Sequence, residues 1–206
     1  MSARKPAMPV NIILLGDPAA GKATQAAYLA KKYKLYDFDM GQELNNARAK
    51  DEKLDAILKR NTDQGKLTPT KICRDILRNV VSSVPVNQGI LFDGHPKMLG
   101  EAKLAAGLLK KQKRPDPIVF YLSIPLNETV KRMKNRTGYF KGKFGKRADD
   151  SDNALKNRAK YYRINIAQVV EYFSKQYQFH KISGMGSRSE VQKQFAAIMK
   201  EFTESK

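Results

Sequence analysis

A glycine-rich segment near the start of the chain carries residues suited to binding phosphate. The apolar run Val10–Leu15 leads into Gly16-Asp-Pro-Ala-Ala-Gly-Lys22-Ala-Thr24, and a helical pattern follows. Backbone N–H groups in such a loop, with the first turn of the next helix, point at one anion, whose outer oxygens a lysine can reach. Ala23 stands where a hydroxyl usually follows the lysine, and Thr24 comes next, either to contact phosphate or to cap the helix. The segment predicts a phosphate-binding loop.

A second candidate segment is Leu91–Lys97, with the sequence Leu-Phe-Asp-Gly-His-Pro-Lys. Asp93 directly follows an apolar strand pattern, and a carboxylate in this place can hold water on Mg²⁺, a cation that prefers oxygen ligands. Gly94 allows the backbone to approach a ligand closely. The alternative interpretation is an Asp-Gly turn that only ends the strand.

Four arginines in the second half of the chain are candidates for neutralising phosphate. Arg132 and Arg136 are four residues apart, so a helix places them on one face. Arg147 and Arg158 follow a stretch rich in glycine and lysine. Planar guanidinium groups suit a transferring phosphoryl group better than ammonium groups do, which makes these two the strongest candidates for stabilising a transition state. Each arginine taken alone is equally consistent with an ordinary surface charge.

Strand and helix patterns alternate along the chain and must position these residues. The predicted strands are Val10–Leu15, Leu35–Phe38, Gly89–Phe92, Pro117–Ile124 and Phe179–Ile182. The predicted helices are Gly21–Tyr33, Gly41–Gln64, Pro69–Val81, Glu101–Lys110, Leu126–Arg136, Ser151–Gln176 and Arg188–Phe202. The alternation predicts one α/β domain with a five-stranded parallel sheet and helices on both faces. In such sheets ligands bind beyond the carboxyl ends of the strands, where Gly16 and Asp93 fall.

Two stretches lie outside that alternation. Residues 40–69 carry a helical pattern without a strand, which indicates a flap inserted after the second strand. Residues 137–146 hold three glycines and three lysines, and we expect a mobile basic lid there. Pro69 suits a first helical turn, with Thr68 as its N-cap.

Composition limits the class of protein. A chain of 206 residues can bury the core of one domain, and no apolar run reaches the roughly 18 residues of a membrane span. The N-terminal residues lack the apolar core of a signal peptide, and one cysteine and two histidines argue against a disulfide or a zinc cluster. We therefore expect a cytoplasmic protein, and one domain with two moving flaps is expected to be a monomer.

The formal net charge of +19 favours anionic ligands. The lysines are spread along the whole chain rather than gathered in one arm, and no aromatic-rich RNA-binding motif interrupts them. The charge therefore supports a multiply phosphorylated substrate, while neither nucleic acid nor a membrane is an expected partner.

The chain resembles the adenylate kinase family over nearly its whole length. Its loop is similar to the family's Gly-x-Pro-Gly-x-Gly-Lys-Gly-Thr-Gln, in which the hydroxyl also comes two residues after the lysine. Four segments carry the resemblance: Gly16–Gln25, Gly65–Pro69, Phe92–Lys97 (similar to Asp-Gly-Phe-Pro-Arg) and Arg147–Asp150 with Arg158 and Tyr161-Tyr162.

The resemblance implies a nucleoside triphosphatase-type α/β fold of the phosphate-loop (P-loop) class. Its core would be residues 1–39, 70–136 and 147–206, with a helical insert at 40–69 that binds a nucleoside monophosphate (NMP) and a short lid at 137–146. It also implies an enzyme that transfers the γ-phosphoryl group of ATP reversibly to AMP, giving two ADP. ATP and Mg²⁺ would be required, with the metal held through ATP and water and by no direct protein ligand.

The resemblance also assigns residues to three roles. The implied catalytic residues are Lys22, Asp93, Arg136, Arg147 and Arg158. The implied ATP-binding residues are Gly16, Ala19, Ala20, Gly21, Lys22, Ala23, Thr24, Arg132, Arg136 and Gly186. The implied NMP-binding residues are Met40, Asn45, Lys66, Leu67, Thr68, Gly94, His95, Pro96, Lys97, Glu101, Arg147 and Arg158.

Several of these positions depart from the family pattern. Two glycines of the family's loop are replaced by Ala19 and Ala23. Either alanine could obstruct the close approach of a ligand to the backbone, or stand where the backbone needs a positive φ. On the acceptor side two arginines are replaced by Asn45 and Lys97. Losing one charge-assisted hydrogen bond costs about 1.5–3 kcal/mol, which predicts weak NMP binding unless a residue such as Lys66 compensates.

The sequence leaves open which base the acceptor nucleotide carries. The family's threonine near the base is Met40, and its adenine-reading glutamine is Glu101. A carboxylate there suits the N1–H and N2 donors of guanine better than the N1 acceptor of adenine. AMP is favoured because the rest of the chain follows the adenylate kinase pattern. The alternatives are a kinase for GMP, CMP or UMP, or a weakly active nucleotide-binding protein that docks on polyanions.

Overall fold

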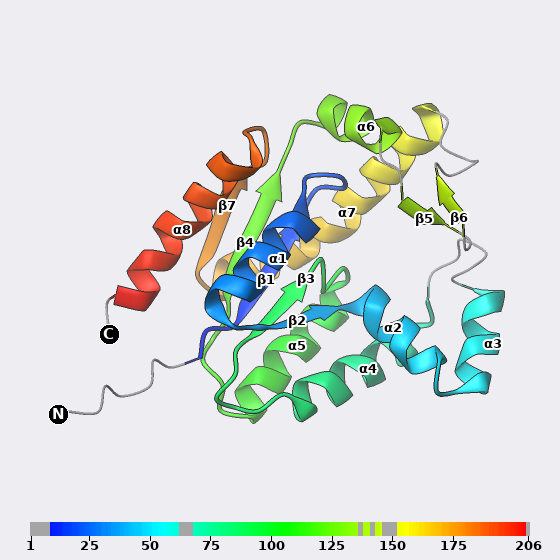
Figure 1. Ribbon diagram of the computed structural model, residues 1–206, viewed down its shortest axis with the longest axis horizontal. Coiled ribbons are helices and arrows are strands. Elements are labelled where there is room, and N and C mark those ends of the chain that lie inside the picture. The colour runs from blue at the N-terminus through cyan, green and yellow to red at the C-terminus, as the bar shows by residue number, and fades with distance from the viewer. Residues whose placement is uncertain (1–8, 62–67, 136–137, 141–142, 146–151, 205–206) are drawn as a thin grey trace.

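The computed structural model describes residues 9–61, 68–135, 138–140, 143–145 and 152–204. Its centre is a five-stranded sheet in which every neighbouring pair is parallel (Figure 1). In sheet order the strands are β2 (Tyr36–Asp39), β3 (Ile90–Asp93), β1 (Ile12–Gly16), β4 (Ile118–Ser123) and β7 (Phe179–Ser183). The predicted five-stranded parallel sheet is confirmed, with strand ends that differ by at most two residues.

Helices cover both faces of this sheet (Figure 1). The described helices are α1 (Lys22–Tyr33), α2 (Met40–Arg48), α3 (Glu52–Arg60), α4 (Thr70–Ser83), α5 (Leu99–Lys111), α6 (Leu126–Asn135), α7 (Asp152–Gln176) and α8 (Arg188–Glu204). The helices α4, α5 and α7 cover one face of the sheet, and α1 and α8 cover the other. Alternate residues of β1 enter two separate cores, because successive side chains of a strand point to opposite faces. Ile13 packs with α4, α5 and α7, whereas Ile12 packs with α1 and α8.

The single helix predicted over 41–64 is wrong, because the chain forms two helices there. α2 ends at Arg48, and a turn precedes α3. Asp51 provides the reason: its side chain accepts a hydrogen bond from the backbone N–H of Leu54 at 3.1 Å, which caps a new helix. Thr68 also does not cap α4, since Pro69 occupies the N-cap position.

Two short strands lie within the stretch that is expected to form the lid. Gly138–Phe140 forms β5 and Lys143–Gly145 forms β6, and the two strands pair antiparallel with Tyr139 opposite Phe144. The sequence interpretation assigned no secondary structure to these residues, and their role as a lid stays a prediction. Aromatic residues favour strands, and here they outweigh the glycines. No helix in the described part of the chain combines the length and apolar character that a membrane crossing needs.

Candidate active site

Two of the segments predicted to carry chemistry, the loop after β1 and the turn after β3, meet at the carboxyl edge of the sheet. β2 and β3 end at Asp39 and Asp93, which are direct neighbours in the parallel register. The next strand, β1, ends at Gly16 and leads into the loop. The backbone N–H of Gly94 donates to the carbonyl of Leu14 at 2.9 Å, which ties the turn after β3 to β1. The topology thus brings two segments that are far apart in sequence, at Gly16 and at Asp93, into one site.

The loop after β1 is tightly folded. A Cβ added at Gly16 would lie 2.4 Å from the carbonyl oxygen of Leu122, so this close approach requires glycine. Gly21 has a φ of 97° and directly precedes α1, and no described heavy atom would lie within 4 Å of a Cβ there. Ala20 is buried. The backbone at Gly21, directly before α1, is therefore open to a ligand.

The two alanines that replace family glycines differ in conformation. Ala19 has a φ of 59°, in the left-handed region that costs an L-residue about 1–2 kcal/mol. The expectation of a positive φ is met at this residue. Ala23 lies inside the first turn of α1 and is exposed, so it needs no such conformation. Thr24, in the same turn, is half-buried.

Lys22 is the first residue of α1 and lies at the centre of the loop. Its Nζ donates to the carbonyl of Gly16 at 2.7 Å and to that of Asp17 at 2.9 Å. The same Nζ lies 5.8 Å from the ring centroid of Tyr162, on α7. A cation held over the carboxyl edge of the sheet, at a helix N-terminus, is suited to binding the phosphates of a nucleotide.

Asp93 shares its surroundings with two further carboxylates. Burial raises its pKa to about 6, and the negative charges of Asp37 and Asp39 act in the same direction. The positive charges of Lys22 and Lys97 oppose this shift. Asp93 thus lies close to the loop lysine, in a place where a cation would stabilise its ionised form.

Glu101 is buried at the start of α5. Its Oε2 accepts hydrogen bonds from the backbone N–H of Lys97 at 3.0 Å and from that of Met98 at 3.3 Å. The bond from Met98, the N-cap residue, satisfies one of the free donors of the helix N-terminus, and the bond from Lys97 fixes the residue before it. The carboxylate at the position expected to read the acceptor base is therefore also a helix cap.

His95 occupies an aromatic core position. It is 2 % exposed, and its ring packs edge to face on Phe38 with centroids 5.4 Å apart. Its Nδ1 lies 3.7 Å from Oε2 of Glu101, and its Nε2 has no hydrogen-bond partner among the described residues. Burial, with a smaller contribution from the charge of Lys97, lowers the pKa of His95 to about 3. The ring is neutral at physiological pH. Pro96, the next residue, is also buried.

Replacing His95 by phenylalanine is expected to stabilise the protein selectively at acidic pH. The folded-state pKa of about 3 lies below the value of about 6.5 in an unfolded chain, so only the unfolded state takes up the proton between these values. The measured quantity is the free energy of unfolding of His95→Phe minus that of the wild type. This difference should be about 2 kcal/mol larger at pH 5 than at pH 7. Urea unfolding at both pH values measures this. Asp93 titrates in both proteins, so its effect cancels, and an unchanged difference would contradict the assignment.

On the other side of the loop, Arg132 connects α6 to the turn after β7. Its Nη1 donates to the carbonyl of Gly184 at 3.0 Å, and its Nε donates to Glu128 at 2.7 Å. A Cβ on Gly184 would lie 3.2 Å from the carbonyl oxygen of Ala20, so this turn packs on the phosphate loop. Arg132 and the turn that contains Gly186 thus lie beside the loop, as the predicted contacts with the ATP base require.

For the remaining predicted residues within the described part of the chain, the structure gives the element and the exposure but no contact with the loop. Met40 begins α2 and packs against the core, Asn45 is exposed on the same helix, and Lys97 is exposed before α5. Thr68 lies two residues before α4. Arg158 lies in α7, but its side chain is not among those described. Four predicted residues fall outside the described parts of the chain: Lys66, Leu67, Arg136 and Arg147.

Two residues beside the loop were missed by the sequence interpretation. Asp17 is buried within the loop, and Arg163 on α7 forms an ion pair with it. Asp17 carried a visible signal, because an acidic side chain inside a loop that binds an anion needs a partner. Arg163 carried none that distinguished it from the other basic residues of α7.

Comparisons with known proteins agree with this geometry. A family model described as adenylate kinase matches residues 14–178. The adenylate kinase of Azobacteroides pseudotrichonymphae is 34 % identical over 182 residues, which cover 88 % of this chain and 93 % of the relative. The adenylate kinase of Methanosarcina barkeri is 27 % identical over 214 positions, covering 94 % and 100 %. With its P-loop α/β fold and a match of this extent, the chain belongs to the adenylate kinase family.

Proposed function

We propose that this chain is an adenylate kinase that transfers the γ-phosphoryl group of ATP to AMP, reversibly and with Mg²⁺, to give two ADP. The observation that carries the proposal is the placement of Lys22, whose ammonium group lies inside the loop at 2.7 Å from the carbonyl of Gly16. That group can exchange its carbonyl partners for phosphate oxygens. We also propose that the enzyme acts as a monomer in the cytoplasm.

The residues at the carboxyl edge fit a triphosphate bound with Mg²⁺. Gly21 leaves the backbone before α1 open to an anion, and Asp93 offers a carboxylate beside Lys22. Mg²⁺, when bound there, would supply positive charge that neutralises the phosphates. Asp93 would hold a water molecule of the metal's shell, and the ion would favour the ionised form of this carboxylate over the protonated form.

Phosphoryl transfer asks the protein for alignment and charge neutralisation and needs no general base. Lys22 would bind the outer phosphates of ATP, and Arg132 would lie against the ATP base. Arg136, Arg147 and Arg158 would surround the transferring group. Movement of the helical insert and of the lid over the nucleotides would exclude water, so that the phosphoryl group passes to AMP.

The acceptor side is the weaker half of the proposed site. Asn45 and Lys97 replace two arginines, and Asp39 adds a negative charge directly beside Asp93. The loss of two guanidinium groups and the negative charge of Asp39 disfavour a dianionic phosphate. The Michaelis constant for AMP is therefore expected to lie well above the low micromolar range, although Lys97 keeps one positive charge. Glu101 keeps GMP as a second candidate acceptor, although one of its carboxylate oxygens already caps α5.

A panel of four nucleotides tests the proposal. ADP formation would be followed with ATP, Mg²⁺ and each of AMP, GMP, CMP and UMP. The highest kcat/KM is expected with AMP, together with a high KM. A low micromolar KM for AMP would contradict the weak acceptor site, preference for GMP would assign Glu101 to guanine, and no turnover with any acceptor would overturn the proposed activity.

A further inference from the structure

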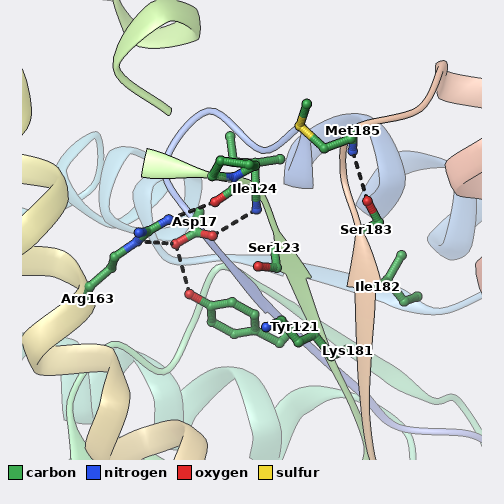
Figure 2. Close-up of a pocket in the computed structure, with 10 residues that line it drawn as sticks. Asp17, Tyr121, Ser123, Ile124, Arg163, Lys181, Ile182, Ser183 and Met185 are labelled. Atoms are coloured by element: carbon green, nitrogen blue, oxygen red, sulfur yellow. Dashed lines mark hydrogen bonds and ion pairs between the residues drawn. The ribbon is translucent and has the colours of Figure 1, made fainter. Parts of the chain in front are cut away.

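Asp17 is a buried carboxylate inside the phosphate loop, 1 % exposed, and its charge is met by three donors (Figure 2). Its Oδ1 accepts from the hydroxyl of Tyr121 and from Nε of Arg163, both at 3.0 Å. Its Oδ2 accepts from the backbone N–H of Ile124 at 2.9 Å. A buried carboxylate with three hydrogen-bond partners is fixed in orientation.

Arg163 makes a second contact that extends the ion pair. Its Nη2 donates to the carbonyl of Ile124 at 2.7 Å. One guanidinium group on α7 therefore holds both the phosphate loop, at Asp17, and the segment between β4 and α6, at Ile124 (Figure 2). We call this arrangement the Asp17–Arg163 clamp.

The clamp joins the elements that carry the proposed phosphate-binding residues. α6 carries Arg132, and α7 carries Arg158 five residues before Arg163. Tyr162, next to Arg163, lies 5.8 Å from the ammonium of Lys22. Since a helix is rigid over one or two turns, fixing α7 at Arg163 also fixes the backbone position of Arg158.

We propose that Asp17 and Arg163 are positioning residues, which hold α7 and the β4–α6 segment in register with the phosphate loop during phosphoryl transfer. This inference rests on the proposed function. Misplacing a reacting group by about 1 Å costs about a hundredfold in rate, so loss of register by a fraction of that distance is expected to cost about tenfold in kcat. Ground-state binding of ATP depends on the loop itself and should change little.

If the pair only stabilised the fold, kcat would recover whenever thermal stability recovers. The two residues differ in burial, which allows stability and kcat to be changed separately. Arg163→Ala leaves the Asp17 carboxylate buried with one partner lost, whereas Asp17→Ala leaves a guanidinium that is already 35 % exposed. Arg163→Ala should therefore unfold at the lowest temperature of the set. The double variant Asp17→Ala/Arg163→Ala removes the unpaired charge and should recover much of the lost thermal stability. Its kcat should nevertheless stay about tenfold below that of the wild type.

The experiment measures kcat, the KM for ATP and the unfolding temperature of the two single variants and the double variant. Arg163→Lys keeps the charge but not the second hydrogen bond, so its kcat should lie between those of Arg163→Ala and the wild type. The matched control is Glu171→Ala, which breaks an exposed ion pair with Lys175 on the same helix and should leave every value unchanged. Wild-type kcat in the double variant would overturn the inference.

Hydrogen exchange provides a readout that does not depend on activity. In the double variant, backbone amides of residues 17–25 and 160–166 are expected to exchange faster than in the wild type, even though thermal stability has recovered. If the wild type forms no ADP, the proposed function fails while this measurement still tests the clamp. Unchanged exchange in both segments would show that the pair does not hold α7 to the loop.

Discussion

Lys22→Ala is expected to lower kcat for ADP formation by at least about a hundredfold, because one preorganised donor to developing charge is worth about 10²–10³ in rate. The ammonium group lies within 3 Å of the carbonyls of Gly16 and Asp17, at the N-terminus of α1. No described side chain of the loop between these residues and α1 offers a second positive charge. A coupled assay with ATP, Mg²⁺ and AMP measures the loss.

The matched control is Lys31→Ala, which removes an exposed lysine from the same helix and should keep wild-type turnover. The alternative function, a nucleotide-binding protein that docks on polyanions, makes the opposite prediction. It would show little turnover before the change, and its polyanion binding would stay salt-dependent and unaltered after it. Turnover within threefold of the wild type in Lys22→Ala would contradict the role assigned to this residue.

The sheet could be predicted from the sequence because its three central strands, β3, β1 and β4, are short apolar runs. Ile12 to Leu15 are fully buried, and a run that is apolar on both faces is typical of a parallel strand covered by helices. The turn residues Gly16 and Asp93 mark where those runs end. The placement of Lys22 in its loop at this edge could also be predicted, since one contiguous motif supplies both, while the role of the loop as a donor site stays a prediction.

Features that depend on distant contacts could not be predicted in this way. Asp17 and Arg163 are 146 residues apart, and only the packing of α7 against the sheet brings them together. Glu101 caps α5, although the pattern placed the start of that helix at Glu101 itself and so hid the capping role. The break before α3 rests on one side chain, Asp51, whose capping competes with a helical pattern that is continuous on either side.

Restoring arginine on the acceptor side is expected to produce the largest gain in activity. Asn45 is exposed on α2, so Asn45→Arg should fold without a large cost in stability. A charge-assisted hydrogen bond contributes about 1.5–3 kcal/mol, so kcat/KM for AMP should rise about tenfold or more in this variant. Lys97→Arg should add a smaller gain, because the lysine already supplies a charge and only the bidentate geometry is new.

In the double variant Asn45→Arg/Lys97→Arg, kcat/KM for AMP should be about a hundredfold higher than in the wild type, with the KM for ATP unchanged. Asn46→Arg is the matched control, since Asn46 is the next residue of α2 and is equally exposed, yet a helix turns it about 100° away from Asn45. If Asn46→Arg lowers the KM for AMP as much as Asn45→Arg does, the gain comes from overall charge, and the acceptor phosphate does not bind where the family's arginine would place it. If only Asn45→Arg lowers it, the weak acceptor site results from the loss of one side chain at one position on α2.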